Sequence, residues 1–324
     1  MGNIEKRGMN PMQQKMLSLI IPVYYEEEVL PESYRRMDAV MRSIGMPYEL
    51  IYVNDGSRDG TMAILRKLAA EHPEVKVYSF SRNFGHQLAV TCGMDHAKGD
   101  ALVIIDADLQ DPPELIPDMV KKWQDGADVV YGKRIKRKGE TLFKKLTASV
   151  YYRILSSMSA YPIPLDTGDF RLIDRKVADV FLKMREKARF LRGMSAWMGF
   201  EAVPIEYVRE ERAAGHTKYT LKKMLSLAAD GILNFSATPL ELPLFVGIGL
   251  GIVGVLGLIG MIVCTAVFGS GCPQWLWLAV GFSLLLAVLF CFQGIQGFYL
   301  GRMYDELKDR PLYIVAEALN EENK

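Results

Sequence analysis

Short apolar runs alternate with amphipathic stretches along the first part of the chain. Apolar runs rich in branched side chains are typical of strands buried on both faces of a parallel sheet. The stretches between them carry apolar residues at helical spacing. This alternation predicts an α/β fold with a mostly parallel sheet, flanking helices and right-handed crossovers. The expected strands are 17–23, 48–53, 75–80, 101–105 and 127–131, and the expected helices are 31–44, 61–71, 87–97 and 115–124.

A different pattern occupies residues 242–301, which contain no Asp, Glu, Lys or Arg. An uncharged block of this length is typical of membrane-spanning helices. We expect a membrane part at 241–301 with two transmembrane helices, 244–268 and 275–299. The preceding stretch, 219–240, has apolar residues at the 3.6-residue period and predicts a juxtamembrane amphipathic helix in the interface.

The charged residues around this block predict its orientation. Basic residues flank the outer ends of the two spans, whereas the connecting loop has none. By the positive-inside rule, both termini are cytoplasmic and the protein is a multi-pass protein of the inner (cytoplasmic) membrane. The remaining segments are then a flexible N-terminus (1–15), a cytoplasmic catalytic domain (16–218) and a cytoplasmic C-terminal tail (302–324).

Composition narrows the classes of partner. The chain has 39 basic and 38 acidic residues, so no net field favours nucleic acid. Its four cysteines lack the paired spacing of metal sites, and no disulfide framework is expected. Small residues along the first span predict close helix packing, either within the pair of spans or between subunits, and we expect a homo-oligomer. They are Gly247, Gly251, Gly254, Gly257 and Gly260.

Acidic residues follow the apolar run 101–105. In an ideal strand Asp106 and Asp108 share one face, and Gln110 continues that row. The carboxyl end of a buried strand is where open α/β sheets bind ligands. Two carboxylates and an amide oxygen suit a hard divalent cation that also holds substrate phosphates. An isolated Asp-x-Asp is more often a solvated turn, so the other motifs decide between the two interpretations.

Four motifs occur in order, each after a predicted strand. They are Pro22-Val-Tyr-Tyr-Glu-Glu27, Val53-Asn-Asp-Gly-Ser-Arg-Asp-Gly-Thr61, Ser81-Arg-Asn-Phe-Gly-His86 and Asp106-Ala-Asp-Leu-Gln-Asp-Pro-Pro-Glu114. This succession resembles family 2 glycosyltransferases of the GT-A fold. More narrowly, it is similar to the polyprenyl-phosphate glycosyltransferases, which include bactoprenol glucosyltransferases and dolichol-phosphate mannose synthases. The resemblance covers roughly residues 17–219; Tyr25 departs from it, because the family more often has Asn there.

The resemblance implies a site for a nucleotide diphosphate sugar. Asp55 is expected at the nucleotide base, and the basic loop 133–138 lies where cations clamp a pyrophosphate, although such a loop is as often simply solvated. The residues expected to bind the nucleotide sugar are Pro22, Tyr24, Glu26, Asp55, Ser57, Arg82, Asp106, Lys133 and Arg134. Asp106, Asp108 and Gln110 are expected to hold Mg²⁺ or Mn²⁺, and Asp108 is therefore counted as catalytic.

The acceptor side is implied by later motifs. Asp169, in Gly-Asp-Phe, is carried over as the catalytic base. A lipid phosphate is already largely ionised near neutral pH (second pKa about 6), so Asp169 could instead position the acceptor. The segment 189–199 resembles the part of the family that completes this side. Arg212 and Lys218, in Arg-Ala-Ala-Gly-His-Thr-Lys-Tyr, are expected to bind the acceptor phosphate; a basic linker before a membrane would look similar.

The expected reaction is inverting transfer of a single sugar, glucose from UDP-glucose, to undecaprenyl phosphate, for cell-envelope glycosylation. UDP-GlcNAc, GDP-mannose or an aminoarabinose nucleotide as donor stays open, because a few side chains around the sugar decide that choice. A more distant alternative is a non-catalytic flippase or scaffold for lipid-linked sugars.

Overall fold

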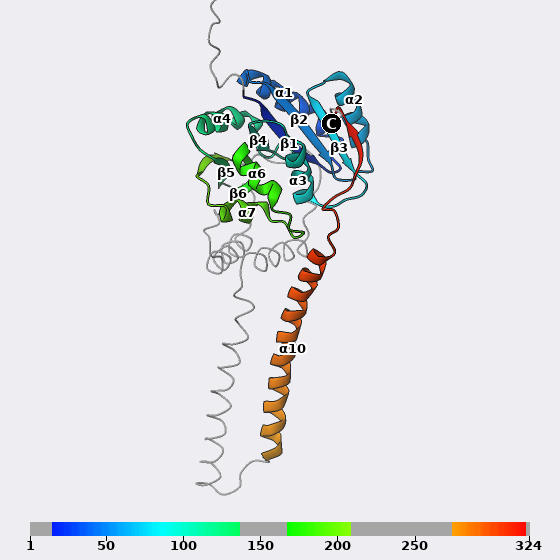
Figure 1. Ribbon diagram of the computed structural model, residues 1–324, viewed down its shortest axis with the longest axis vertical. Coiled ribbons are helices and arrows are strands. Elements are labelled where there is room, and N and C mark those ends of the chain that lie inside the picture. The colour runs from blue at the N-terminus through cyan, green and yellow to red at the C-terminus, as the bar shows by residue number, and fades with distance from the viewer. Residues whose placement is uncertain (1–14, 137–166, 209–273, 322–324) are drawn as a thin grey trace, which may run out of the picture.

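The computed structural model describes residues 15–136, 167–208 and 274–321. Its first half has the predicted alternation of strands and helices (Figure 1). These elements are β1 (Leu17–Val23), α1 (Leu30–Ile44), β2 (Tyr48–Asn54), α2 (Thr61–Glu71), β3 (Val75–Phe80), α3 (His86–His96) and β4 (Ala101–Ile104). The predicted α/β class is confirmed, and each bound lies within a residue or so of its predicted place.

The second half contains strands that the sequence patterns did not identify. The helical turn η2 (Pro113–Leu115) and α4 (Ile116–Gln124) occupy the predicted helix, and β5 extends the predicted strand. The elements that follow are β5 (Val129–Lys136), β6 (Thr167–Asp174), α6 (Arg175–Lys183), α7 (Leu191–Trp197), β7 (Ala202–Val208), α10 (Gln274–Leu307) and β8 (Val315–Leu319).

The strands of the described residues form one sheet, in the order β7-β5-β6-β4-β1-β2-β3-β8. β3, β2, β1 and β4 are parallel neighbours, so their carboxyl ends meet at one edge. β6 runs antiparallel to β4 and pairs Arg171 with Ile104. Continuing this register sets Asp169 beside Asp106. The start of β6 therefore reaches the edge at which the parallel strands end.

Two hydrophobic clusters cover the two faces of the sheet. Leu19 and Ile21 of β1 belong to the cluster beneath α1, α2 and α4, whereas Ile20 belongs to the one beneath α3, α6 and α7. Alternate residues of a strand point to opposite faces, which explains this division. All three side chains are fully buried, as expected for a strand inside a parallel sheet.

The C-terminal part differs from its prediction. The expected tail, 302–324, begins inside α10 and then contributes β8 to the catalytic sheet, so a domain boundary at residue 218 omits one strand. β8 covers the edge of β3, whose backbone groups would otherwise stay unpaired. Figure 1 shows α10 extending from the domain, with its C-terminal end nearest the sheet, and the chain continuing from that end to β8.

The membrane predictions are only partly addressed by the described residues. The second predicted span falls within the helix α10, which has 34 residues. Among the helices that the structure describes, none is long and apolar enough to cross a membrane. The flexible N-terminus up to residue 14, the amphipathic helix 219–240 and the first span 244–268 lie outside the described residues.

Candidate active site

The loops after β2 and β3 are joined through Asp55. Its carboxylate accepts hydrogen bonds from the backbone N–H of Phe84 (2.7 Å) and Gly85 (3.0 Å) and from Nδ2 of Asn83 (2.7 Å). Burial raises the pKa of Asp55, while the bonds from Phe84 and Gly85 oppose that rise. Asp55 thus holds the 83–85 loop in place, and its expected contact to a nucleotide base stays a prediction.

Gly56 allows these two loops to approach closely. Its φ is +70°, and a Cβ atom there would lie 2.5 Å from the carbonyl carbon of Arg82. No side chain fits at that distance, so a glycine is required at this position. Arg82 itself is exposed, and its guanidinium lies 4.0 Å from the ring centre of Phe84.

The loop after β1 packs against the start of α2. Tyr25 takes the left-handed conformation (φ 56°), and its N–H donates to Oγ of Ser57 at 3.0 Å. The N–H of Glu26 donates to Oγ1 of Thr61 at 3.1 Å. The first three strand ends therefore bring together most of the predicted donor-binding residues. These are Pro22, Tyr24, Glu26, Asp55, Ser57 and Arg82.

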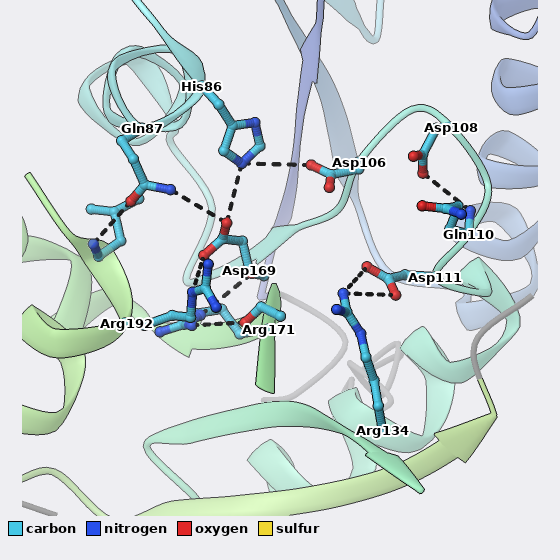
Figure 2. Close-up of polar contacts among 12 residues, drawn as sticks. His86, Gln87, Asp106, Asp108, Gln110, Asp111, Arg134, Asp169, Arg171 and Arg192 are labelled. Carbon is cyan, nitrogen blue, oxygen red and sulfur yellow. Dashed lines mark hydrogen bonds and ion pairs between the residues drawn. The ribbon is translucent and has the colours of Figure 1, made fainter. Parts of the chain in front are cut away.

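The acidic residues predicted to bind metal lie in a loop. β4 ends at Ile104, so the expectation that Asp106 and Asp108 share the face of a strand is wrong. The chain turns at Leu109, which has φ 56°, and the N–H of Gln110 donates to Oδ1 of Asp108 at 3.1 Å. In Figure 2, Asp106 points toward His86, whereas Asp108 lies beside Gln110.

The charge on this loop fits a cation. Burial raises the pKa of Asp106 to about 6, His86 opposes that rise, and the carboxylates of Asp108, Asp169 and Asp111 add to it. The described residues contain no group of three or more His, Cys, Asp or Glu that could hold a metal. Mg²⁺ usually needs only one or two carboxylates, since waters and substrate phosphates complete its shell. Asp106 and Asp108, with the amide of Gln110, fit a cation that arrives with a pyrophosphate.

Asp169 stands at the centre of the opposite side of the site. Its Oδ1 lies 3.2 Å from Nε of Arg192, and its Oδ2 lies 3.4 Å from Nε2 of His86. Gln87 donates to the same Oδ2 at 3.3 Å. His86 also lies 3.6 Å from Oδ1 of Asp106, so the imidazole separates the two carboxylates (Figure 2).

These contacts determine the protonation states of the pair. Burial raises the pKa of Asp169, but Arg192 and His86 outweigh it and hold the pKa well below its usual range. Burial lowers the pKa of His86, but Asp106 and Asp169 outweigh it and raise the pKa to about 9. At neutral pH an imidazolium therefore lies between two ionised carboxylates. A carboxylate held in this way accepts a proton poorly.

Arg134 lies in a second network, which includes Asp111 of the loop after β4. Its Nη2 is 3.4 Å from Asp111, and its Nε is 3.1 Å from the hydroxyl of Tyr207, which donates to Asp111. Asp111 and Tyr207 are buried. Lys133 pairs with the exposed Glu206 at 2.9 Å. Both predicted pyrophosphate-binding cations are thus held by acidic side chains, and a pyrophosphate contact stays a prediction.

Several residues of the site were not identified as such from the sequence. His86 closes one of the four motifs, and Arg192 lies in the segment expected on the acceptor side, but neither was assigned a role. Asp111 belongs to the acidic motif after the run 101–105 but was assigned no role, and Gln87 carried no signal beyond its neighbourhood. Asp169 lies in β6, a strand that the sequence patterns did not identify and whose Phe170 and Leu172 are buried in the core. Arg212 and Lys218 lie outside the described residues.

Comparison with known proteins gives consistent matches. The family model described as "Glycosyl transferase family 2" matches residues 18–182. The chain is 50% identical over 307 residues to the uncharacterized glycosyltransferase YkcC of Bacillus subtilis, covering 95% of each chain. It is 38% identical over 302 residues to the bactoprenol glucosyl transferase of Shigella phage SfII, covering 93% of this chain and 98% of that one. Among solved structures, it resembles the mannosyltransferase PcManGT from Pyrobaculum calidifontis in complex with GDP-Man and Mn²⁺, with 17% identity and a TM-score of 0.43 over 93% of this chain and 90% of that one.

Proposed function

Because the chain belongs to glycosyl transferase family 2, we propose that this glycosyltransferase moves one sugar from a nucleotide diphosphate sugar to a polyprenyl phosphate. We further propose UDP-glucose as the donor and undecaprenyl phosphate as the acceptor. The similarity to a bactoprenol glucosyl transferase over nearly that protein's full length supports both choices. UDP-GlcNAc, GDP-mannose and aminoarabinose nucleotides are the donors against which this choice is tested.

One observation carries the proposal: Asp106 and Asp169 lie on either side of His86, at 3.6 and 3.4 Å. Asp106 continues the row of loops at the ends of β1, β2 and β3. Asp169 and Arg192 come from β6 and α7, on the other side. A donor pyrophosphate held by the first group and an acceptor phosphate held by the second would meet at this point.

The donor side would bind through its carboxylates. Asp106, Asp108 and Gln110 would hold Mg²⁺ or Mn²⁺. Such an ion supplies Lewis acidity and neutralises negative charge on a departing nucleotide diphosphate. Asp55 keeps the 83–85 loop ordered next to this site through its backbone hydrogen bonds.

The acceptor side would act through fixed charge. A phosphate oxygen of the lipid would form a bond to the anomeric carbon on the face opposite the leaving nucleotide, as that carbon's bond to the diphosphate breaks, which inverts its configuration. A lipid phosphate is largely ionised near neutral pH, so the step needs no strong base. Asp169 then serves to hold Arg192 and His86 toward the incoming phosphate, and Arg212 and Lys218 would add further cations.

A membrane location follows from the acceptor, which is a lipid. We propose an inner (cytoplasmic) membrane enzyme with both termini cytoplasmic, which assembles as a homo-oligomer through its glycine-rich first span. The uncharged block 242–301 supports this proposal. So do the exposed apolar side chains along α10, which a purely aqueous surface seldom carries in such number. They include Trp275, Leu278, Phe282, Leu285 and Leu289.

The test is sugar transfer by the purified full-length chain in detergent. Radiolabelled UDP-glucose and the alternative nucleotide sugars are offered with undecaprenyl phosphate, with and without EDTA. We expect label in the lipid from UDP-glucose, lost with EDTA and in Asp108→Asn. Glu32→Gln is the matched control, because it removes only an exposed carboxylate that pairs with Arg35. Transfer from another donor would overturn the choice of glucose, and no transfer from any donor by folded protein would overturn the reaction.

A further inference from the structure

The segment 312–320 joins the catalytic domain after the chain has passed through α10. β8 lies along β3, antiparallel to it, with Leu319 opposite Val77 and Val315 opposite Phe80. Figure 1 shows this segment rising from the end of α10 to the outer edge of the sheet. The last strand of the sheet therefore comes from a part of the sequence far from the four motifs.

Three side chains fasten this segment to different elements. Glu317 accepts two hydrogen bonds from Arg66 of α2, at 2.9 and 2.7 Å. Asn320 donates to backbone carbonyls at the end of α2 and the start of β3, at 2.6 and 2.9 Å. The hydroxyl of Tyr313 donates to Oδ2 of Asp95 of α3 at 2.6 Å. The segment is fixed at both ends and not only through its strand.

The first residues of this segment contact the loop 81–85, which follows β3. The N–H of Ser81, the residue that opens this loop, donates to the carbonyl of Ile314 at 3.1 Å. The ring of Tyr313 stacks on Phe80, with centroids 5.1 Å apart and planes 20° apart. Phe80 in turn meets Phe84 edge to face at 5.5 Å.

This aromatic row ends at the residue that Asp55 holds. The backbone N–H of Phe84 donates to Asp55 at 2.7 Å, so the position of Phe84 and the hydrogen bonds of Asp55 depend on each other. Phe80 is buried, and Tyr313 covers the face of its ring. Loss of that cover would let Phe80 shift, and Phe84 with it.

We propose that Tyr313 is a positioning residue for nucleotide-sugar binding, which acts through Phe80 and Phe84 on the loop that Asp55 holds. The inference rests on the proposed function, since it takes the loops after β2 and β3 as the nucleotide site. It makes the chain beyond α10 a component of the donor site. Tyr313 touches no reacting atom and acts only through the two phenylalanines.

The test is UDP binding by the full-length chain in detergent with Mn²⁺, measured by titration calorimetry. Aromatic pairs contribute enough that losing the ring in Tyr313→Ala is expected to raise the Kd for UDP by about three- to tenfold. Tyr313→Phe keeps the stacking and should bind UDP as the wild type does. Tyr313→Leu keeps the bulk without the ring, and serves where Tyr313→Ala does not fold; its Kd should rise too.

Kinetics and a control separate positioning from general destabilisation. In Tyr313→Leu the KM for the donor should rise while kcat and the KM for the acceptor stay near their wild-type values. Glu317→Gln loosens the same segment at α2, away from the aromatic row, and should leave the Kd unchanged. An equal rise of the Kd for UDP in Glu317→Gln and Tyr313→Leu, or no rise of that Kd in Tyr313→Leu, would overturn the inference. UDP binding by the wild-type protein would then leave the proposed function standing. Wild-type protein that binds UDP but transfers no sugar would overturn the proposed function alone.

Discussion

Substitution of Asp169 by Asn tests whether this carboxylate acts by its charge. The change keeps the size of the side chain and removes the negative charge from a cluster in which Arg192 and His86 lie at 3.2 and 3.4 Å. Arg171 is buried close by and adds a third positive charge. Without Asp169 these cations face one another, and Asp106, close to His86, remains as a counter-charge. We therefore expect loss of stability together with loss of activity.

The size of the effect can be worked from the burial of the partners. Removing one partner of a buried ion pair costs about 3–5 kcal/mol. The side chains of Asp169, Arg192 and His86 are 15%, 20% and 36% exposed, so water screens part of the loss. We expect about 2–3 kcal/mol after this discount for screening. At about 2–4 °C per kcal/mol for a domain of this size, the Tm falls by about 4–12 °C.

The assay combines thermal unfolding of the full-length chain with a pH profile of transfer. The Tm of Asp169→Asn is compared with that of Glu32→Gln, whose ion pair with Arg35 is exposed and contributes little to stability. A carboxylate whose pKa lies far below its usual range stays ionised across pH 5–9, so Asp169 itself should add no limb to the pH profile. Its loss should lower the height of the profile and move any limb that belongs to Asp106 or His86 to lower pH, because Asp169 raises the pKa of both. An acidic limb that is present in the wild type and vanishes in Asp169→Asn would refute this reasoning, because it would identify Asp169 as a titrating general base. An unchanged Tm would refute the charge argument.

Three further predictions concern His86, Gly56 and Asp106. Because the pKa of His86 is raised from 6.5 to about 9, its contribution to stability is complete below pH 6.5 and is lost as the pH rises through about 9. The shift corresponds to about 3 kcal/mol, reduced to about 1–2 kcal/mol by the exposure of the side chain. The Tm of the wild type should therefore fall more than the Tm of His86→Gln between pH 6.5 and 9.5, and parallel profiles of Tm against pH would contradict this prediction. Gly56→Ala should destabilise the fold by more than about 1 kcal/mol and weaken UDP binding, because its Cβ would meet the backbone of Arg82. Gly45→Ala is the control, because Gly45 has the same φ of 70° with open space around it; it should destabilise the fold less and leave UDP binding unchanged. Equal effects of the two substitutions would contradict the close approach at Gly56. Mn²⁺ binding should weaken about tenfold between pH 7 and pH 5, because protons compete for Asp106, whose pKa is about 6; a Kd for Mn²⁺ that does not vary with pH would contradict a role for Asp106 as a ligand.

The sequence determined the parallel half of the fold and the motifs of the donor side. Each strand from β1 to β4 is a short apolar run, and each helix between them carries apolar residues on one face. Both features are local, so periodicity reveals them. The ends of these strands were predicted to gather the residues of the donor site, and Pro22, Ser57 and Arg82 lie there. Local pattern also identified Asp106 and Asp108, although not the turn at Leu109 that takes them out of the strand.

Only the tertiary structure decided what stands opposite the donor side. β6 lies between β5 and β4 and runs antiparallel to both, and this pairing sets Asp169 beside Asp106. No periodicity within residues 167–174 specifies the neighbour of that strand, because pairing depends on contacts with distant segments. The same holds for β8, which reaches β3 from the far end of the chain because the edge of β3 offers unpaired backbone groups. The ion pairs of His86 with two carboxylates exist only once those strands have come together.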